Sequence, residues 1–141
     1  MAALPSPQKF HQPPLQAERD QARHYNRKTK DIKSDALPYF GAVGESPSVL
    51  LWGDSQAYCF LPAFDVLGKD MNFSGVAVTH GARAPLLGGF IRDDFGRGED
   101  LPQWGRAVVD YVAAHRIKDI FLACLWEGYV DKYDRDRFTG A

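Results

Sequence analysis

The tripeptide Gly53-Asp54-Ser55 stands directly after the apolar run Val49–Trp52, and its residue types suit nucleophilic chemistry. A short, continuous apolar run is typical of a parallel strand that is covered on both faces. Gly53 lets the backbone turn sharply, and catalytic groups of open α/β sheets gather at the carboxyl ends of the strands. The turn can therefore present the Ser55 hydroxyl as a nucleophile at the edge of a sheet.

Two further apolar segments are expected to build the sheet around this turn. The segment Ser74–Thr79 predicts a second strand, and Ile117–Leu125 predicts a third. Between them, apolar residues recur at helical spacing from Trp104 to His115, and a helix followed by a strand implies a parallel crossover. These patterns predict an α/β fold with a parallel sheet in a three-layer arrangement.

The residues after Ser55 predict a core-facing helix. Its apolar stripe consists of Ala57, Phe60, Leu61, Phe64 and Leu67. Pro62 lies inside the stripe, where a proline costs about 3 kcal/mol in a regular helix. A kinked helix that begins at Ser55 would aim its amide dipoles at the serine oxygen, whereas a helix that begins at Pro62 would weaken this effect. The sequence leaves both starts open.

Composition and charge limit the classes of protein that fit. The chain has 141 residues, 45% of them hydrophobic, which is enough for one domain with a core. Residues 1–47 are rich in Pro, Gln and charge and predict a polar lead-in segment. Residues 48–141 are the predicted domain portion, and Ser48–Trp126 holds nearly every core candidate. A weak apolar stripe allows a short exposed helix over Gln16–Lys33. The formal net charge of -1 gives no electrostatic reason to propose a nucleic-acid partner.

Cys59 and Cys124 are the two cysteines of the chain, and both are expected to be buried as small hydrophobic side chains. No histidine or acid stands at ligand spacing from them, so we expect neither a metal nor a cofactor. A disulfide between them stays open. No run approaches the roughly 20 apolar residues of a membrane span, and the first residues carry no visible export signal.

Four stretches between Tyr39 and Tyr129 carry a family resemblance. They are Ser48-Val-Leu-Leu-Trp-Gly-Asp-Ser-Gln-Ala, Leu61-Pro-Ala-Phe-Asp, the segment Thr79–Leu87 with its end Ala84-Pro-Leu-Leu, and His115-Arg-Ile-Lys-Asp-Ile-Phe-Leu-Ala before Trp126. Together they resemble the SGNH, or GDSL-type, hydrolases, in the branch carried by membrane O-acyltransferases that modify bacterial surface polysaccharides. The resemblance implies an SGNH-hydrolase-like (flavodoxin-like) fold, truncated at its C-terminus.

The resemblance also implies roles for individual residues. Ser55 would be the nucleophile, and its own backbone amide would contribute to the oxyanion hole. Gly81 would supply a second oxyanion amide after the second strand, with Gly75 as the other candidate. Asp54 would shape the turn through its hydrogen bonds rather than act as a triad acid. Trp126 is a candidate sugar platform, with a packing role equally open.

The chain departs from the family pattern in its general base and in one donor of the oxyanion hole. The family takes its general base from a histidine in a C-terminal Asp-x-x-His element, which does not occur here. His80 is expected to bond backbone or solvent, and His115 to form the polar edge of a helix. Asn26 and Asn72, the two asparagines, both precede the third strand, so the family's third-block asparagine is missing. Gln56 stands where that branch usually has histidine.

Two functions stay open on these grounds. The first is acyl-ester transfer or hydrolysis at carbohydrate hydroxyls through an acyl-serine at Ser55, on the periplasmic face of the inner membrane beside a multi-pass acyltransferase domain. The second is a catalytically incompetent SGNH fragment or pseudo-enzyme that at most binds glycan, which we expect for the isolated chain. An unrelated nucleotide-binding module is disfavoured, because the turn lacks the repeated glycines of a phosphate loop.

Overall fold

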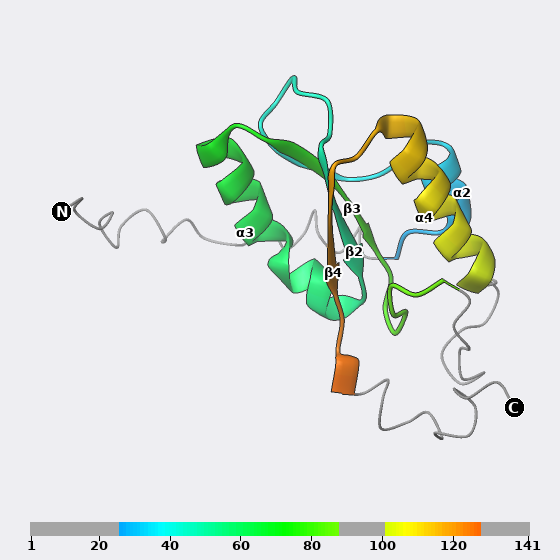
Figure 1. Cartoon of the computed structure of the whole chain (residues 1–141). Coiled ribbons are helices and arrows are strands. Elements are labelled where there is room, and N and C mark those ends of the chain that lie inside the picture. Colours follow the sequence, from blue (N-terminus) through cyan, green and yellow to red (C-terminus); the bar gives the residue numbers. More distant parts are fainter. Residues whose placement is uncertain (1–25, 88–100, 128–141) are drawn as a thin grey trace, which may run out of the picture.

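The fold places one mixed sheet between helices on its two faces (Figure 1). The computed structural model describes residues 26–87 and 101–127. The elements in chain order are α2 (Thr29–Lys33), β1 (Tyr39–Gly41), β2 (Val49–Gly53), α3 (Ser55–Met71), β3 (Ser74–Thr79), α4 (Leu101–His115) and β4 (Asp119–Ala123). The strand order is β1-β3-β2-β4. The predicted three-layer α/β arrangement is confirmed.

Strand β2 is the centre of the sheet, and all five of its residues are buried. Leu50 and Trp52 pack on the face that α4 covers, whereas Val49 and Leu51 pack on the face that α3 covers. Gly53 pairs in parallel with Thr79 of β3 on one side and with Ala123 of β4 on the other. The continuous apolar run therefore marks a strand covered on both faces, and three strands end together just before Ser55.

Helix α3 begins at Ser55, which decides between the two starts that the sequence left open. Its 17 residues contain Pro62 in the interior, and its N-cap is Asp54. Asn72 ends the helix in the left-handed conformation, with φ at 58°. The amide dipoles of a helix of this length are therefore directed at the Ser55 position.

The apolar stripe of α3 is only partly buried, which corrects the prediction of a core-facing stripe. Ala57 is fully buried, and Leu61 and Phe64 pack against the core beneath α3. Phe60 and Leu67 are 52% and 48% exposed. In the described part of the chain β4 is the outermost strand on this side, so these two side chains have no strand to pack on.

The opposite face is closed by α4, whose buried residues include Trp104, Val108 and Tyr111. These side chains pack with Leu50 and Val76 in one core cluster. The strand that follows α4 spans Asp119–Ala123, which is shorter than the predicted Ile117–Leu125. The predicted helix and parallel strand are both present.

The segment before β2 contributes more to the described structure than the sequence indicated. Helix α2 covers only Thr29–Lys33, and its Ile32 is 2% exposed, so the prediction of an exposed helix was wrong at this residue. Phe40 of β1 is also buried. Strand β1 pairs antiparallel with β3, which corrects the expectation of a wholly parallel sheet. Gly75 permits this pairing, because a Cβ there would overlap the Phe40 ring.

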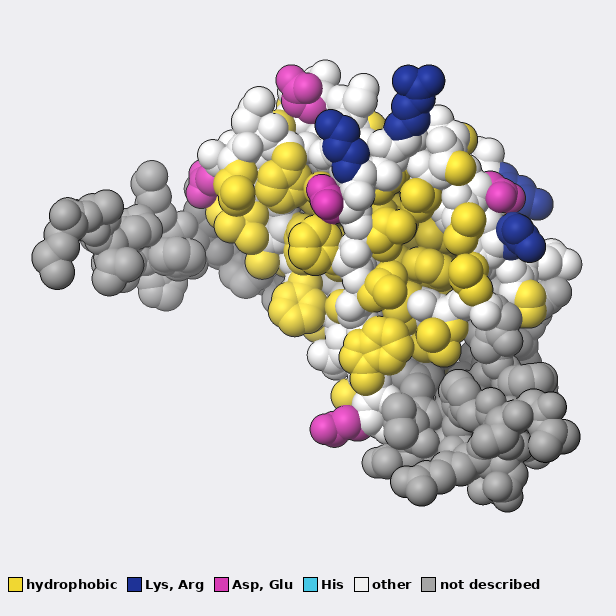
Figure 2. Space-filling view, viewed as in Figure 1, with side chains coloured by type: hydrophobic (Ala, Val, Ile, Leu, Met, Phe, Trp, Pro, Cys, Tyr) yellow, Lys and Arg dark blue, Asp and Glu magenta, His cyan; other side chains and the backbone are white. Residues whose placement is uncertain are grey.

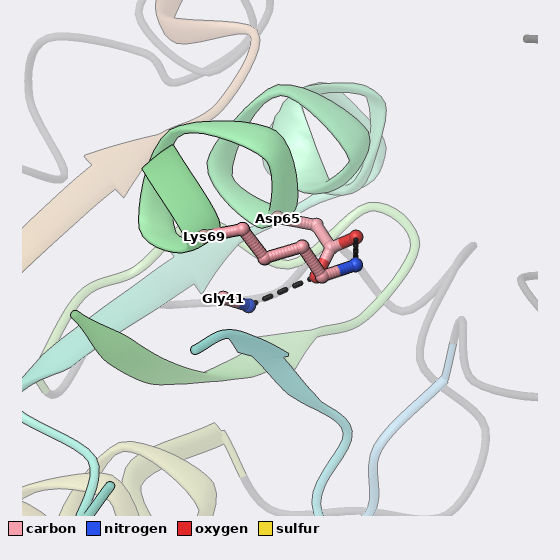
Figure 3. A network of polar contacts seen from close by, with 3 residues as sticks. All are labelled: Gly41, Asp65 and Lys69. Carbon is pink, nitrogen blue, oxygen red and sulfur yellow. Dashed lines mark hydrogen bonds and ion pairs between the residues drawn. The ribbon is translucent and has the colours of Figure 1, made fainter. Parts of the chain in front are cut away.

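Helix α3 is fastened to β1 near its C-terminal end. The Gly41 amide donates to Asp65 Oδ1 at 2.9 Å, and the Lys69 ammonium pairs with the same carboxylate (Figure 3). A Cβ on Gly68 would lie 2.5 Å from the Gly41 Cα, so glycine is needed at this close approach. The first strand and the end of α3 are thus held together by backbone contact as well as by charge.

The two cysteines differ in burial, which corrects half of the prediction. Cys124 is buried, whereas Cys59 is exposed, and both are free thiols. Cys59 follows the buried Ala57 by two positions, which turns it to the outer side of α3. The open question of a Cys59–Cys124 disulfide is therefore answered, because the two thiols are not joined in the described structure.

Candidate active site

Ser55 is the first residue of α3 and lies just beyond the carboxyl end of β2, where its side chain is half-buried. Among the residues that the structure describes, none hydrogen-bonds the Ser55 hydroxyl. A hydroxyl at a helix N-terminus that is neither fully buried nor held by a neighbour is accessible to a ligand, and negative charge developing on it is favoured by the helix dipole.

Gly53 is the point at which β2, β4 and α3 meet. A Cβ at this position would overlap the carbonyl oxygen of Ala123 and would lie 2.9 Å from the Cβ of Ala57. The neighbouring Asp54 amide donates to that same Ala123 carbonyl at 3.3 Å. The turn that carries Ser55 is therefore packed directly against the backbone of β4, and only glycine fits there.

Asp54 is a buried carboxylate, 3% exposed, that binds two backbone amides. Its Oδ1 accepts from the Gln56 amide at 2.8 Å and so caps α3. Its Oδ2 accepts from the Leu125 amide at 3.1 Å, in the segment after β4. These bonds hold the turn in shape and tie it to the end of the neighbouring strand.

Gly81 follows β3, and its amide is already engaged. It donates to Oδ1 of Asn26 at 2.9 Å. The Asn26 side chain reaches it because Arg27 N donates to Thr79 O at 2.9 Å, which holds this segment beside β3. Sequence reasoning missed Asn26, since no local pattern signals a contact across 55 positions. The amide proposed as the second oxyanion donor therefore has a competing acceptor.

The other candidate glycine, Gly75, lies at the far end of the sheet. It pairs with Val49 at the start of β2, whereas Thr79 pairs with Gly53 at the end. Four residues of strand, at about 3.3 Å per residue, separate these two levels. Gly75 therefore serves the packing of Phe40 and does not share the edge that carries Ser55.

His80 is held within the turn after β3. Its amide donates to Gly53 O at 3.0 Å, which joins this turn to the Ser55 turn. Its Nδ1 lies 3.0 Å from Gly81 O, and its ring packs edge-on against Trp104 with centroids 6.3 Å apart. The histidine is thus bonded to backbone, as expected, and not to Ser55.

Trp104 organises this turn from the first part of α4, a role that the sequence reading assigned only to packing. Its Nε1 donates to Arg27 O at 2.9 Å, and its ring contacts Trp52 at 5.8 Å. The guanidinium carbon of Arg83, a residue only 4% exposed, lies 5.7 Å from the Trp104 ring centroid. The turn after β3 is therefore fixed by an aromatic and cationic cluster on the α4 side.

Trp126 lies in the segment after β4 and is 43% exposed. The preceding Leu125 amide is bound by Asp54, so Trp126 belongs to the same edge of the sheet as Ser55. An aromatic ring that is half open to solvent at this edge can stack on a ligand.

His115 is not brought to this edge. It ends α4, next to the start of β4, and its ring stacks on Tyr111 with centroids 4.0 Å apart. In residues 26–87 and 101–127 the histidines are His80 and His115, and neither bonds Ser55. In these ranges no histidine is therefore hydrogen-bonded to Ser55 as a general base would be.

The Cys124 thiol lies close to the Asp54 carboxylate but does not offer a second nucleophile. Burial and, to a lesser extent, the negative charge of Asp54 together raise the pKa of Cys124 to about 12. The thiol is therefore neutral at physiological pH, and the thiolate is the reactive form of cysteine. Of these two side chains, Ser55 is therefore the candidate nucleophile.

Within 26–87 and 101–127, no three or more His, Cys, Asp and Glu side chains gather as a metal site would require. In the same ranges, no helix has the length and apolar character needed to cross a membrane.

The described fold is an α/β domain in which a strand and a glycine-containing turn lead into a helix that begins at a serine. The family model described as "SGNH domain (fused to AT3 domains)" matches residues 12–141, and the chain belongs to this family. The family is of hydrolase and acyltransferase type, and its description places its members in fusion with AT3 domains. No curated protein and no solved structure matches the chain.

Proposed function

We propose that the chain carries the nucleophile of an SGNH-type O-acyltransferase or esterase that acts on carbohydrate, with Ser55 as the acyl-bearing residue. The observation that supports this most is the Ser55 hydroxyl at the N-terminus of α3, to which no residue in the described ranges hydrogen-bonds, in a chain that belongs to the SGNH family. Gly53 and Asp54 build the turn, and Trp126 is the proposed contact for a sugar ring.

The proposed chemistry has two steps. Ser55 Oγ loses its proton to a base and attacks the ester carbonyl, and the C=O π electrons move to oxygen to give an oxyanion. The Ser55 amide, with Gly81 as proposed second donor, stabilises that charge. The intermediate collapses to an acyl-serine and the alcohol leaves with a proton. A carbohydrate hydroxyl or a water then attacks the acyl-serine and restores Ser55.

The alternative proposal is a catalytically incompetent domain that at most binds glycan. Two observations favour it for this chain. Neither His80 nor His115 bonds Ser55, and the Gly81 amide is occupied by Asn26. Without a base the attack by serine would be severely slowed, although an oxyanion hole and binding alone retain some catalysis in hydrolases that lack triad members.

The setting of this activity is also proposed. The family's fusion to AT3 domains supports a membrane acyltransferase as the functional partner. In such a pair the SGNH domain would act on the extracytoplasmic side, where surface polysaccharide is found. The acyl group would pass from the membrane partner to Ser55 and then to the sugar.

Imidazole in solution can stand in for the missing base and so separates the two proposals. We expect a fluorophosphonate probe to label the chain slowly, with labelling that increases with imidazole and maps to Ser55 by peptide mass spectrometry. Ser55→Ala should abolish it. Ser48→Ala is the matched control, because Ser48 lies at the opposite end of β2, where its amide donates to Ser74 O at 2.8 Å.

The outcomes are distinct. Labelling of Ser55 that requires imidazole supports the acyl-serine proposal. It would also show that the isolated chain lacks an effective general base. An absence of labelling at every imidazole concentration, in a chain shown to be folded by circular dichroism, would overturn it. Binding of an oligosaccharide that is lost in Trp126→Ala would then favour the incompetent, glycan-binding domain.

A further inference from the structure

The Gly81 amide is held by a polar contact at the surface of the molecule. Figure 2 shows hydrophobic side chains gathered over α3 and β4. In the turn after β3, by contrast, the Gly81 amide donates to Asn26 Oδ1 at 2.9 Å, and Asn26 is exposed. Exposed hydrogen bonds open more readily than contacts within a packed apolar core. A ligand can therefore displace the Asn26 side chain from this amide.

The backbone beside this contact is fixed to two elements of the fold. The Arg27 amide donates to Thr79 O of β3 at 2.9 Å, and Trp104 Nε1 of α4 donates to Arg27 O at 2.9 Å. These two bonds hold Asn26 next to Gly81. Asn26 can leave the amide by rotation of its own side chain, while both bonds of Arg27 remain in place.

The contact lies next to the turn that carries the nucleophile. Thr79 pairs with Gly53, two residues before Ser55, and the His80 amide donates to Gly53 O at 3.0 Å. A backbone amide has one hydrogen to donate. The Asn26 oxygen and the oxygen of a ligand therefore compete for the Gly81 amide at this edge of the sheet.

We propose that Asn26 is an inhibitory residue, whose side-chain oxygen competes with the oxyanion of the acylation step for the Gly81 amide. This inference rests on the proposed function, in which Gly81 is the second oxyanion donor. A carboxamide oxygen is neutral, whereas hydrogen bonds to a charged acceptor are roughly twice as strong. The oxyanion therefore displaces Asn26, but the exchange lowers the gain from the Gly81 bond and slows the attack by Ser55.

The turn that contains Gly81 has a further hydrogen bond of its own. The Arg83 amide donates to His80 O at 3.2 Å and closes the turn without Asn26. Between them, Ala82 has a φ of 56°, in the left-handed region that residues other than glycine seldom adopt. Removal of the Asn26 side chain should therefore release the Gly81 amide, and a glycine at position 82 would relieve the strain that could distort the released turn.

Labelling of Ser55 by a fluorophosphonate probe with imidazole tests the inhibition. Asn26→Ala should raise the rate by about two- to ten-fold, which corresponds to the loss of one neutral hydrogen bond. Asn26→Asp should lower it about five-fold or more, because a carboxylate binds the amide more strongly and repels the oxyanion. Loss of folding cannot produce these opposite changes. Ser34→Ala is the matched control, since it removes an exposed bond of the same segment, from Ser34 Oγ to Asp31 O at 3.3 Å, and should leave the rate unchanged.

Hydrogen exchange of the Gly81 amide, measured by NMR, tests the contact without any chemistry at Ser55. Asn26→Ala should make this amide exchange about two- to ten-fold faster, and Asn26→Asp should make it exchange more slowly. Both changes should also be present in a Ser55→Ala chain. The labelling rates should be compared again in an Ala82→Gly background, where glycine adopts the required φ without strain.

The outcomes separate the inhibition from the proposed function. Faster labelling in Asn26→Ala, slower labelling in Asn26→Asp and faster exchange at Gly81 in Asn26→Ala support the proposal together. Labelling of Ser55 that Asn26→Ala does not accelerate in either background would overturn the inhibition and leave the acyl-serine intact. Unchanged exchange at Gly81 would overturn the contact itself. A chain in which no variant is labelled at Ser55 would overturn the proposed function and the inhibition with it.

Discussion

Asp54 and Leu125 are joined by a hydrogen bond of 3.1 Å from the Leu125 amide to the Asp54 carboxylate, across 71 positions of the sequence. The same carboxylate caps α3 through the Gln56 amide at 2.8 Å. One buried side chain therefore holds the serine turn, the start of the helix and the segment after β4 in a single arrangement. The position of Ser55 relative to Trp126 depends on it.

Removal of the Asp54 carboxylate should destabilise the fold. Asp54→Ala loses a helix cap, at about 1 kcal/mol, and leaves a part-buried Leu125 amide without its acceptor, at about 1 to 3 kcal/mol. Asp54→Asn should lose less, because the amide oxygen can still cap α3. Urea denaturation followed by circular dichroism measures both. Asp70→Asn, at an exposed position of α3, should remain close to wild type; equal losses in all three variants would contradict the proposed role.

Gly53→Ala should be the most damaging single methyl addition at the candidate site. The new Cβ would overlap the Ala123 carbonyl oxygen, so β2 and β4 would have to separate. We expect a loss of more than about 3 kcal/mol in the free energy of unfolding, at the upper end of overpacking costs. Gly44→Ala is the comparison, because a Cβ there meets nothing within 4 Å and only the positive φ of 87° opposes it. It should cost about 1 kcal/mol.

Asn26→Ala should release the Gly81 amide. If Gly81 serves as an oxyanion donor, imidazole-dependent labelling of Ser55 should become several-fold faster, since the donor no longer bonds the Asn26 oxygen at 2.9 Å. Labelling rates with a fluorophosphonate probe measure this. A slower rate in a folded variant would show instead that Asn26 positions the turn after β3. Asn72→Ala, at the end of α3, provides a control away from the site.

Cys124 should give the stability of the fold a dependence on pH. Its pKa is raised from 9.0 to about 12 in the folded chain, so the unfolded thiol ionises first. The contribution of this thiol is complete below about pH 9 and is lost as the pH rises towards 12. The difference in free energy of unfolding between wild type and Cys124→Ala, measured from pH 8 to pH 11, should therefore shrink. A constant difference would contradict the raised pKa.

The difference in burial between Cys59 and Cys124 predicts that alkylating reagents modify only one of them in the folded chain. Iodoacetamide at pH 8 should alkylate the exposed Cys59 and leave Cys124 untouched until the chain is unfolded. Intact mass spectrometry of native and denatured samples counts the modified thiols. Equal labelling of both cysteines in the native chain would show that the β4 end opens readily.

Sequence reasoning succeeded where a pattern extends over a whole element. The run Val49–Trp52 was recognisable as a doubly covered strand, and the helical spacing from Trp104 to His115 gave α4, because burial imposes these patterns directly. Sequence reasoning did not predict elements that are too short to show a periodic pattern. Strand β1 has only three residues, too few to show alternation, and its antiparallel pairing depends on the lack of a side chain at Gly75.

The candidate site was predictable in part for a related reason. Gly53, Asp54 and Ser55 are adjacent in sequence, so their arrangement follows from local geometry. The contact between Asn26 and Gly81, and the packing of Arg83 on Trp104, join segments that only the folded chain brings together. The exposure of Phe60 and Leu67 was missed because a helical stripe shows which side is apolar, but not how far the sheet beneath it extends.

The two fastenings of α3 have a mechanical consequence. At its first turn the helix is bound to the β4 side through Asp54. Ten residues beyond Ser55, about 15 Å further along at 1.5 Å per residue, Asp65 accepts a hydrogen bond from the Gly41 amide of β1. The helix is thus attached to the two outer strands of the described sheet, to the β4 side near its start and to β1 near its end. A shift of β1 relative to the sheet would therefore displace α3 and, with it, the Ser55 hydroxyl at the first turn of the helix.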